Sequence, residues 1–219
     1  MSSTNPRSAP ENLVKSKQRV VDHGEVFTPA WMVEAMLDLV KDESQRIDSR
    51  FLEPACGDGN FLRQVLSRKL STVQARYGEN DFERRHYALL ALMCTYGIEL
   101  LADNAQDCRD NLVAMFTKFI GTDPEGVWRK AAESVTAVNI VQADALTMLF
   151  PDGSPLVFPE WGYLGKGKFQ RRDFEYANLT QRGSFTDTLF EGFEFEDVFK
   201  SATDFPQMTV VQIAELGGN

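Results

Sequence analysis

The sequence predicts an α/β fold with a parallel sheet, because short apolar runs alternate with longer segments of helical periodicity. The apolar runs lie at 51–55, 94–98 and 138–142, and each leads into a polar or glycine-containing turn. Between these runs, apolar residues recur every three or four positions, as they do on one face of an amphipathic helix. Strands and helices that alternate in this way form a parallel sheet of the doubly wound type.

Local signals place the helices around these strands. Thr28 has the side chain of an N-cap and Pro29 suits the first helical position, whereas the charged segment 41–49 is expected to form a connector. Asp103 followed by Gln106 has the spacing of a capping box and predicts the start of another helix. Further helices are predicted at 61–70, at 81–93 and, after a break at 121–126, before the third strand.

The regular pattern ends near Phe150, and this boundary defines the predicted domains. Residues 1–24 are polar and turn-rich and are expected to form an N-terminal arm. Residues 25–149 carry the strands and helices of the predicted sheet domain. Residues 150–219 are expected to form an irregular C-terminal extension, in which a basic part at 161–182 precedes an acidic part.

Composition and charge exclude several classes of protein. The 219 residues include 23 Lys and Arg against 32 Asp and Glu, which gives a net charge of −9 and excludes a globally basic nucleic-acid binder. Any DNA contact must therefore be local or shared with a partner. The three cysteines lack CxxC spacing, so neither a disulfide framework nor a metal site is expected. With no apolar run of about 18 residues and no apolar N-terminal leader, we expect a cytoplasmic protein.

Three features follow the predicted strands, at the sheet edge where open parallel sheets bind their ligands. The first strand leads into 56–60, a turn whose glycines let the backbone approach a ligand closely. Glu99 ends the second strand, where its carboxylate can accept hydrogen bonds from ribose hydroxyls. Asp144 follows the third strand, where it can accept a hydrogen bond from the exocyclic amine of adenine. Together these features predict an adenosine-containing ligand.

The spacing of these features argues against a dinucleotide. Dinucleotide-binding folds use GxGxxG, with the ribose-binding acid about 20 residues later. In this chain Leu62 occupies the third glycine position and Glu99 lies much farther along. A turn with a purely structural role is the alternative for the glycine motif taken alone.

Four segments resemble, in order, the motifs of the S-adenosylmethionine-dependent DNA amino-methyltransferases of restriction-modification systems. Glu53–Phe61 (EPACGDGNF) resembles motif I, and Gly24–Pro29 (GEVFTP) resembles motif X. Gly97–Leu100 (GIEL) resembles motif II, and Gln142–Leu146 (QADAL) resembles motif III. The order X, I, II, III is that of N6-adenine methyltransferases. The resemblance implies a Rossmann-like methyltransferase fold with a twisted parallel sheet, S-adenosylmethionine as cofactor and DNA adenine as substrate.

The resemblance also implies which residues hold the methionine part of the cofactor. Thr28 and the turn at 55–57 would contact the methionine moiety, and Glu53 would help to hold its amino end. The complete implied cofactor-binding set is Thr28, Glu53, Pro54, Ala55, Cys56, Gly57, Ile98, Glu99, Leu100, Asp144 and Ala145.

The remaining members of this set would hold the adenosine part. Glu99 would bind the ribose hydroxyls, and either Ile98 or Leu100 would pack on the adenine ring. Asp144 and Ala145 would bind the adenine edge. For each carboxylate, a helix cap or a solvated loop acid is the alternative role.

The family's fourth motif, Asn-Pro-Pro-Tyr or a close variant, does not follow motif III in this sequence. In the family, its Asn side chain and a proline carbonyl accept hydrogen bonds from the target amine, while its aromatic ring stacks on the flipped base. No catalytic residue is therefore assigned. The sheet is expected to be truncated, with an open edge that either the chain's own tail or a second polypeptide covers.

We therefore expect the cofactor-binding part of a split adenine-N6 methyltransferase. Its partners would be DNA and a second polypeptide that carries the Asn-Pro-Pro-Tyr motif and target recognition. The alternatives are a non-catalytic S-adenosylmethionine-binding regulatory subunit and a methyltransferase that acts on a substrate other than DNA. The candidates for DNA phosphate contact are Lys166, Lys168, Arg171 and Arg172, for which a solvated basic loop is the alternative.

Overall fold

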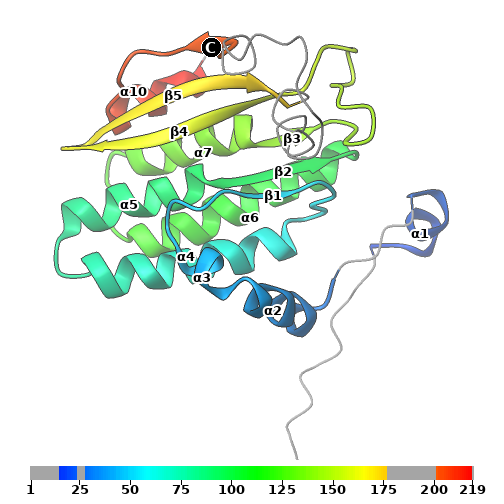
Figure 1. The fold of residues 1–219 in the computed structure, drawn as a ribbon, viewed down its shortest axis with the longest axis horizontal. Coiled ribbons are helices and arrows are strands. Elements are labelled where there is room, and N and C mark those ends of the chain that lie inside the picture. Colours follow the sequence, from blue (N-terminus) through cyan, green and yellow to red (C-terminus); the bar gives the residue numbers. More distant parts are fainter. Residues whose placement is uncertain (1–14, 24–27, 177–200, 219) are drawn as a thin grey trace, which may run out of the picture.

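The computed structural model describes residues 15–23, 28–176 and 201–218, which form a parallel sheet, an antiparallel sheet and the helices around them (Figure 1). In chain order the elements are α1 (Lys17–His23), α2 (Ala30–Leu39), α3 (Lys41–Gln45), β1 (Phe51–Glu53), α4 (Asn60–Tyr77), α5 (Asp81–Met93), β2 (Thr95–Glu99), α6 (Ala102–Ile120), α7 (Val127–Asn139), β3 (Ile140–Gln142), β4 (Val157–Gly165), β5 (Lys168–Glu175), β6 (Thr203–Asp204), α10 (Val210–Glu215) and the 3₁₀ helix η1 (Leu216–Gly218). The first four residues of the motif X segment, 24–27, lie outside the described residues, as does most of the acidic part of the tail.

The predicted α/β fold with a parallel sheet is confirmed. Strands β1, β2 and β3 pair in parallel in that order, with Phe51 opposite Thr95 and Gly97 opposite Ile140. Strand β2 is central and all five of its residues are buried, which agrees with its apolar sequence. The three strands end at the same edge of the sheet, as the sequence predicts.

The two faces of the parallel sheet are covered differently. A Cβ atom on Gly97 would lie 2.8 Å from Cys56 Sγ and 3.0 Å from Leu62 Cδ1, so this face of β2 packs against the motif I turn and α4. Tyr96 points to the opposite face, because neighbouring strand residues alternate. There its hydroxyl donates a hydrogen bond to the carbonyl of Pro159 in β4, at 2.9 Å. Figure 1 shows the same layering, with α4, α5 and α6 on one side and β4 and β5 on the other.

The prediction of an irregular extension after residue 150 is wrong for most of its described part. Strands β4 and β5 form an antiparallel hairpin, β6 pairs with β5, and α10 follows. The hairpin turns through Gly165, Lys166 and Gly167, all with positive φ. Phe158, Trp161, Phe169, Met208 and Ile213 from this region are buried in the same core as the parallel sheet. Along β5 the two buried residues, Phe169 and Phe174, stand among polar and charged residues, so the composition of the segment does not indicate a strand.

Asn139 joins the hairpin to the parallel sheet. It ends α7, immediately before β3, and it is only 1% exposed. Its side-chain Nδ2 donates to the carbonyls of Met93 and Thr95, at 2.9 and 3.1 Å, on either side of the junction between α5 and β2. Its Oδ1 accepts a hydrogen bond of 3.0 Å from the buried indole of Trp161 in β4. One amide therefore satisfies two strand-entry carbonyls and a buried indole.

Two predicted helix starts and one predicted connector differ from the structure. Helix α2 begins after Pro29 without a side-chain cap, so Thr28 is not its N-cap. The carbonyl of Thr28 instead accepts a hydrogen bond from the Asn60 side chain at the start of α4. Helix α6 begins after Leu101, because Glu99 already binds the N–H of Leu101, and the capping box predicted at Asp103 does not form. Part of the predicted connector forms the short helix α3.

The outer edge of β1 has no strand beside it in the described part of the chain. The order β1-β2-β3 leaves β1 at the margin of the sheet, and β4, β5 and β6 form a separate sheet. Of the two covers predicted for this edge, the described part of the tail supplies none. Helix α2 packs on Val65 of α4 and on Phe51 of β1 through Val33 and Leu37, and it leaves Trp31 and Leu39 exposed.

Among the described residues, each helix is too short or too polar to cross a bilayer.

His86 lies where the tip of the hairpin docks on α5. Its ring packs against Phe82, Trp128, Tyr163 and Phe169, with centroid distances of 4.1 to 5.9 Å. Its Nδ1 lies 2.7 Å from the carbonyl of Phe82 and serves as the donor, which leaves a neutral ring among aromatic neighbours. Burial lowers the pKa of His86 below its usual value.

Replacing Asn139 with Ala is expected to lower the free energy of unfolding by about 2–4 kcal/mol, because three buried groups lose their partner. Urea denaturation followed by circular dichroism measures the change. Gln142→Ala, which removes a single exposed hydrogen bond to Leu100, is the control and should cost much less. Equal losses in the two variants would contradict the role given to Asn139.

The lowered pKa of His86 predicts that acid weakens the fold. Between the native pKa and the unfolded value of about 6.5, only the unfolded chain binds the proton. The stability is therefore complete above about pH 6.5 and falls as the pH drops through this window. Denaturation from pH 8 to 5 should show a steeper loss for the natural chain than for His86→Phe, which keeps the ring packing. Parallel pH profiles would contradict this prediction.

Candidate functional site

A cavity of about 540 Å³ opens at the carboxyl ends of β1, β2 and β3. Its lining residues are Thr28, Met36, Glu53, Pro54, Ala55, Cys56, Gly57, Asp58, Asn60, Phe61, Glu99, Leu100, Leu101, Asn104, Ala143, Asp144, Ala145 and Leu146. The segments that resemble motifs X, I, II and III all contribute to this set, although they lie far apart in sequence. Ten of the eleven implied cofactor-binding residues line the cavity, and the volume is within the range of roughly 300–1,000 Å³ that is typical of ligand sites.

The motif I turn needs its glycines for conformation and for space. Gly57 and Gly59 have φ of +54° and +87°, in the left-handed region that favours glycine. A Cβ atom on Gly59 would lie 2.6 Å from Cys108 Sγ of α6, too close for any contact. Because Gly59 has no side chain, the turn passes close to α6. Helix α4 begins at the next residue, Asn60, which lines the cavity.

Glu99 ties the turn to the start of α6. One carboxylate oxygen accepts the N–H of Gly57 at 2.9 Å, and the other accepts the N–H of Leu101 at 3.0 Å. The residue is only 8% exposed, yet it lines the cavity. The amide of Asn104 also donates to the oxygen that binds Leu101, at 3.5 Å, so the oxygen that binds Gly57 is the one that retains a lone pair for a donor of a ligand.

Two further carboxylates of the motif I segment reach the cavity. Burial raises the pKa of Glu53, although a hydrogen bond from the backbone of Ala55 opposes the shift. The Oδ1 atom of Asp58 is buried and has no hydrogen-bond partner among the described residues. A buried carboxylate oxygen without a donor is costly, so the Oδ1 atom of Asp58 is a candidate acceptor for a water or a ligand donor.

Cys56 is a packed side chain of the turn. Its sulfur hydrogen-bonds with Cys108, and this contact together with burial raises the pKa of the thiol. A thiol with a raised pKa is a poor nucleophile. Cys56 therefore supports the shape of the cavity floor.

Asp144 shapes the third side of the cavity. Its Oδ1 accepts the N–H of Leu146 at 2.9 Å, and its backbone pairs with that of Leu149, so the segment after β3 forms a tight turn. This turn leaves Leu146 94% exposed, while Leu100 after β2 is 56% exposed. Both leucines line the cavity, where a flat apolar ligand surface could cover them.

The structure separates two residues that the sequence treats as alternatives. Ile98 is fully buried in the core and does not line the cavity, whereas Leu100 does. Sequence reasoning missed Asp58, Asn60 and Asn104, although the first two belong to the motif I turn. Asn104 lies five residues after Glu99, to which its amide donates at 3.5 Å.

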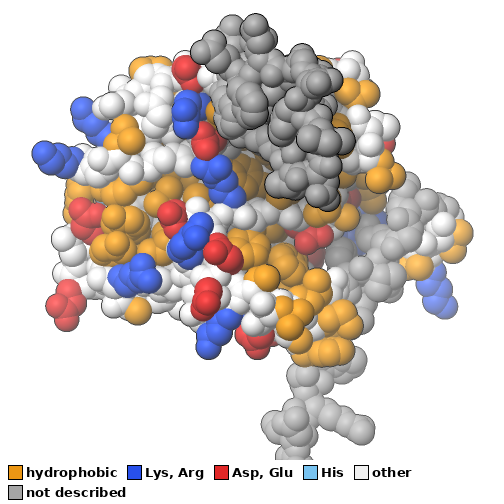
Figure 2. Space-filling view, in the orientation of Figure 1, with side chains coloured by type: hydrophobic (Ala, Val, Ile, Leu, Met, Phe, Trp, Pro, Cys, Tyr) orange, Lys and Arg blue, Asp and Glu red, His pale blue; other side chains and the backbone are white. Residues whose placement is uncertain are grey.

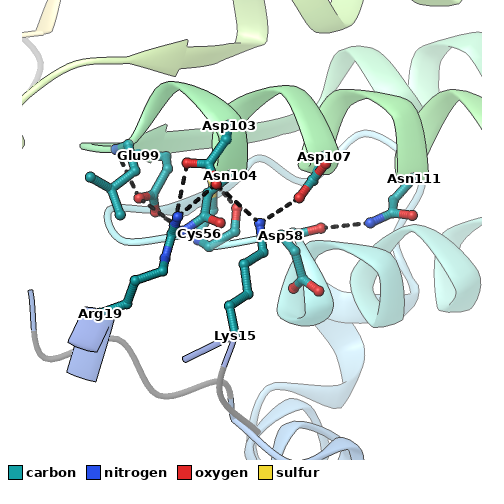
Figure 3. A network of polar contacts seen from close by, with 11 residues as sticks. Lys15, Arg19, Cys56, Asp58, Glu99, Asp103, Asn104, Asp107 and Asn111 are labelled. Carbon is teal, nitrogen blue, oxygen red and sulfur yellow. Dashed lines mark hydrogen bonds and ion pairs between the residues drawn. The ribbon is translucent and has the colours of Figure 1, made fainter. Parts of the chain in front are cut away.

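Helix α1 is attached beside the cavity by ion pairs (Figure 3). Arg19 and Lys15 bind Asp103 in the first turn of α6, at 2.7 and 3.5 Å, and Lys15 also binds Asp107. The hydrogen bond from Arg19 lowers the pKa of Asp103 to about 2. Figure 3 shows this network next to Glu99 and Asn104, so the described part of the N-terminal arm reaches the rim of the cavity.

The predicted DNA-contact residues do not form one basic surface. Arg171 lies on the core side of β5, where its guanidinium binds both oxygens of Asp173 at 2.7 and 2.8 Å. Arg172 points the other way and binds Glu160 at 2.7 Å. Lys166 and Lys168 are exposed near the hairpin turn. In the described ranges, no group of His, Cys, Asp and Glu side chains has the arrangement of a metal site.

Comparison with known proteins identifies no relative of this chain. No protein-family model, no curated protein and no solved structure matches the chain. The case for its function therefore rests on the geometry of the cavity and on the four motif-like segments that line it.

Proposed function

We propose that the chain binds S-adenosylmethionine in the cavity at the carboxyl ends of β1, β2 and β3 and serves in the N6 methylation of adenine in DNA. The observation that carries the proposal is the convergence of the motif X, I, II and III segments on one cavity of about 540 Å³. Three of these segments follow parallel strands, whose carboxyl ends meet at one sheet edge, and Thr28 of the motif X segment joins them there from before α2. When bound, the cofactor would supply a methyl group carried on a sulfonium.

The residues present fit such a ligand. Glu99 offers lone pairs to ribose hydroxyls, and Leu100 and Leu146 offer apolar contacts to the adenine ring. Asp144 and Ala145 lie where the adenine edge would meet the sheet. The unpartnered Oδ1 of Asp58 and the half-buried Glu53 suit the cationic amino end of methionine.

The proposal includes a partner that brings the Asn-Pro-Pro-Tyr motif. Its support is the outer edge of β1, which lacks a neighbouring strand within the described residues. A further parallel strand there would place the residues that follow it at the same sheet edge as Glu53 and Glu99. DNA would then be bound mainly by the partner, in keeping with the net charge of −9 of this chain.

Asp144→Asn is expected to weaken binding of S-adenosylmethionine about ten- to a hundredfold, a loss of about 1–3 kcal/mol. The variant keeps an oxygen for the N–H of Leu146 and so preserves the turn, but it can present a donor to the adenine amine. Isothermal titration calorimetry measures the affinity. Asp152→Asn, an exposed residue outside the cavity, is the matched control and should bind normally. Unchanged affinity of Asp144→Asn would remove the adenine assignment, and no binding by the natural chain would remove the cofactor.

The split arrangement predicts that the chain alone transfers no methyl group to DNA. Incubation with DNA and S-adenosylmethionine labelled in the methyl group, followed by nucleoside analysis, measures N6-methyladenine. Activity should appear only after a polypeptide with the Asn-Pro-Pro-Tyr motif is added. N6-methyladenine formed by the purified chain would contradict the need for a partner, while cofactor binding without activity in any mixture would favour a regulatory subunit.

A further inference from the structure

A second cavity, of about 470 Å³, lies at the opposite edge of the parallel sheet. Arg50 and Cys94, which immediately precede β1 and β2, line it, so it opens at the amino ends of these strands. The cavity is lined by Arg46, Ile47, Asp48, Arg50, Arg76, Tyr77, Tyr87, Leu90, Cys94, Trp161, Gly162 and Tyr163, and we call it the arginine pocket. It shares no residue with the cavity at the carboxyl ends.

The charge of the arginine pocket is opposite to that of the whole chain. Three arginines and one carboxylate line it, in a protein with a net charge of −9. Arg76 forms no hydrogen bond or ion pair with any described residue. Arg50 shares its partner, Glu160, with Arg172, so one carboxylate faces two guanidiniums. Arg46 has only solvent-exposed pairs, with Glu43 and Asp48, and such pairs are weak.

A buried ammonium adds to this positive charge. Lys69 is fully buried under the pocket and donates hydrogen bonds to the carbonyls of Ser49 and Cys94, the latter at 3.1 Å. Burial lowers the pKa of Lys69 to about 8, so the charged form still prevails at pH 7. The carboxylate of Asp48 and the guanidinium of Arg46, which line the pocket, both act on the charge of Lys69, so this ammonium lies within electrostatic range of the pocket.

The floor and one wall of the arginine pocket are apolar and aromatic. Trp161, Leu90 and Cys94 are buried beneath it. The half-buried rings of Tyr77 and Tyr87 stack on each other at 4.0 Å, and Tyr163 meets Tyr87 edge to face at 5.2 Å. Figure 2 shows this face as a band of hydrophobic side chains between β4 and α5, bordered by Lys and Arg side chains with Asp and Glu side chains among them.

We propose that the arginine pocket binds a nucleotide, with its phosphate at Arg46, Arg50 and Arg76 and its base against the tyrosine wall. Guanidiniums bind phosphate oxygens through paired N–H donors, and tyrosine rings stack on the flat face of a base. The proposed ligand is thus a phosphate ester joined to an aromatic ring. It can be a free nucleotide or one unit of a single-stranded nucleic acid. This site is separate from the proposed S-adenosylmethionine site and does not depend on it.

Titration of the full chain with thymidine 5′-monophosphate tests the proposal, since this probe lacks the adenosine for which the first cavity is suited. Arg76→Gln should weaken binding about tenfold, the value of one charge-assisted hydrogen bond. This variant removes no hydrogen bond or ion pair among the described residues, so we expect it to keep the fold, which circular dichroism verifies. Arg129→Gln is the matched control, because Arg129 is 65% exposed on α7 and lies outside both cavities. Asp144→Asn controls for binding in the first cavity, and both controls should bind like the natural chain.

A parallel titration with single-stranded oligothymidylate identifies the source of the ligand. Tighter binding of the oligonucleotide with the same loss in Arg76→Gln supports a nucleic-acid strand, whereas binding of the mononucleotide alone supports a free nucleotide. The proposal is overturned when neither probe binds at millimolar concentration, or when Arg76→Gln and the double variant Arg46→Gln/Arg76→Gln both bind like the natural chain.

Discussion

The arrangement of both sheets depends on the side chain of Asn139. Its two N–H donors hold the carbonyls of Met93 and Thr95, where α5 gives way to β2, and Asn139 itself is the residue before β3. The entries of β2 and β3 are therefore fixed relative to each other, and the ladder that pairs Gly97 with Ile140 follows from that point. The remaining Oδ1 accepts from Trp161, which fixes the hairpin on the far face. A hydrophobic residue could fill the same volume, but it would leave three buried polar groups without partners.

The register set at the strand entries decides where the strands end, and thus where the site is. Glu99 and Asp144 come together because β2 and β3 run parallel and leave the sheet at one edge. Glu99 then performs a second task, since its carboxylate holds the N–H groups of Gly57 and Leu101. The same atoms that suit ribose hydroxyls also stabilise the loops around the cavity. A substitution at Glu99 would consequently change the fold and the site together, whereas Asp144 allows the binding role to be examined with the turn kept.

The sequence predicts the parts of the molecule whose structure is determined locally. Strands at 51–55, 94–98 and 138–142, the helices between them and the strand-end carboxylates all depend on short-range patterns, and they are found close to the predicted positions. The sequence does not predict the hairpin, because Phe169 and Phe174 of β5 are buried by packing against residues distant in sequence. Their neighbours along the strand are mostly charged, so no apolar run marks it. The choice between Ile98 and Leu100 depends on which face of the β2 end meets the cavity. The pairing of Arg171 with Asp173 depends on both residues lying on the same face of β5. The arginine pocket joins residues from four separate segments, so no local pattern indicates it.

The direction of β1 limits what can pair with its outer edge. An antiparallel strand would satisfy the same backbone groups, but it would bring its amino end to the cavity at the carboxyl ends of β1, β2 and β3 and carry its following residues away from it. Only a parallel strand delivers the residues after it to the edge that holds Glu53, Glu99 and Asp144. A parallel strand also needs a crossover connection, usually a helix, which would cover one face of the extended sheet. The unpaired edge of β1 in the described part of the chain therefore suits the proposed partner best when that partner adds a strand and a helix together.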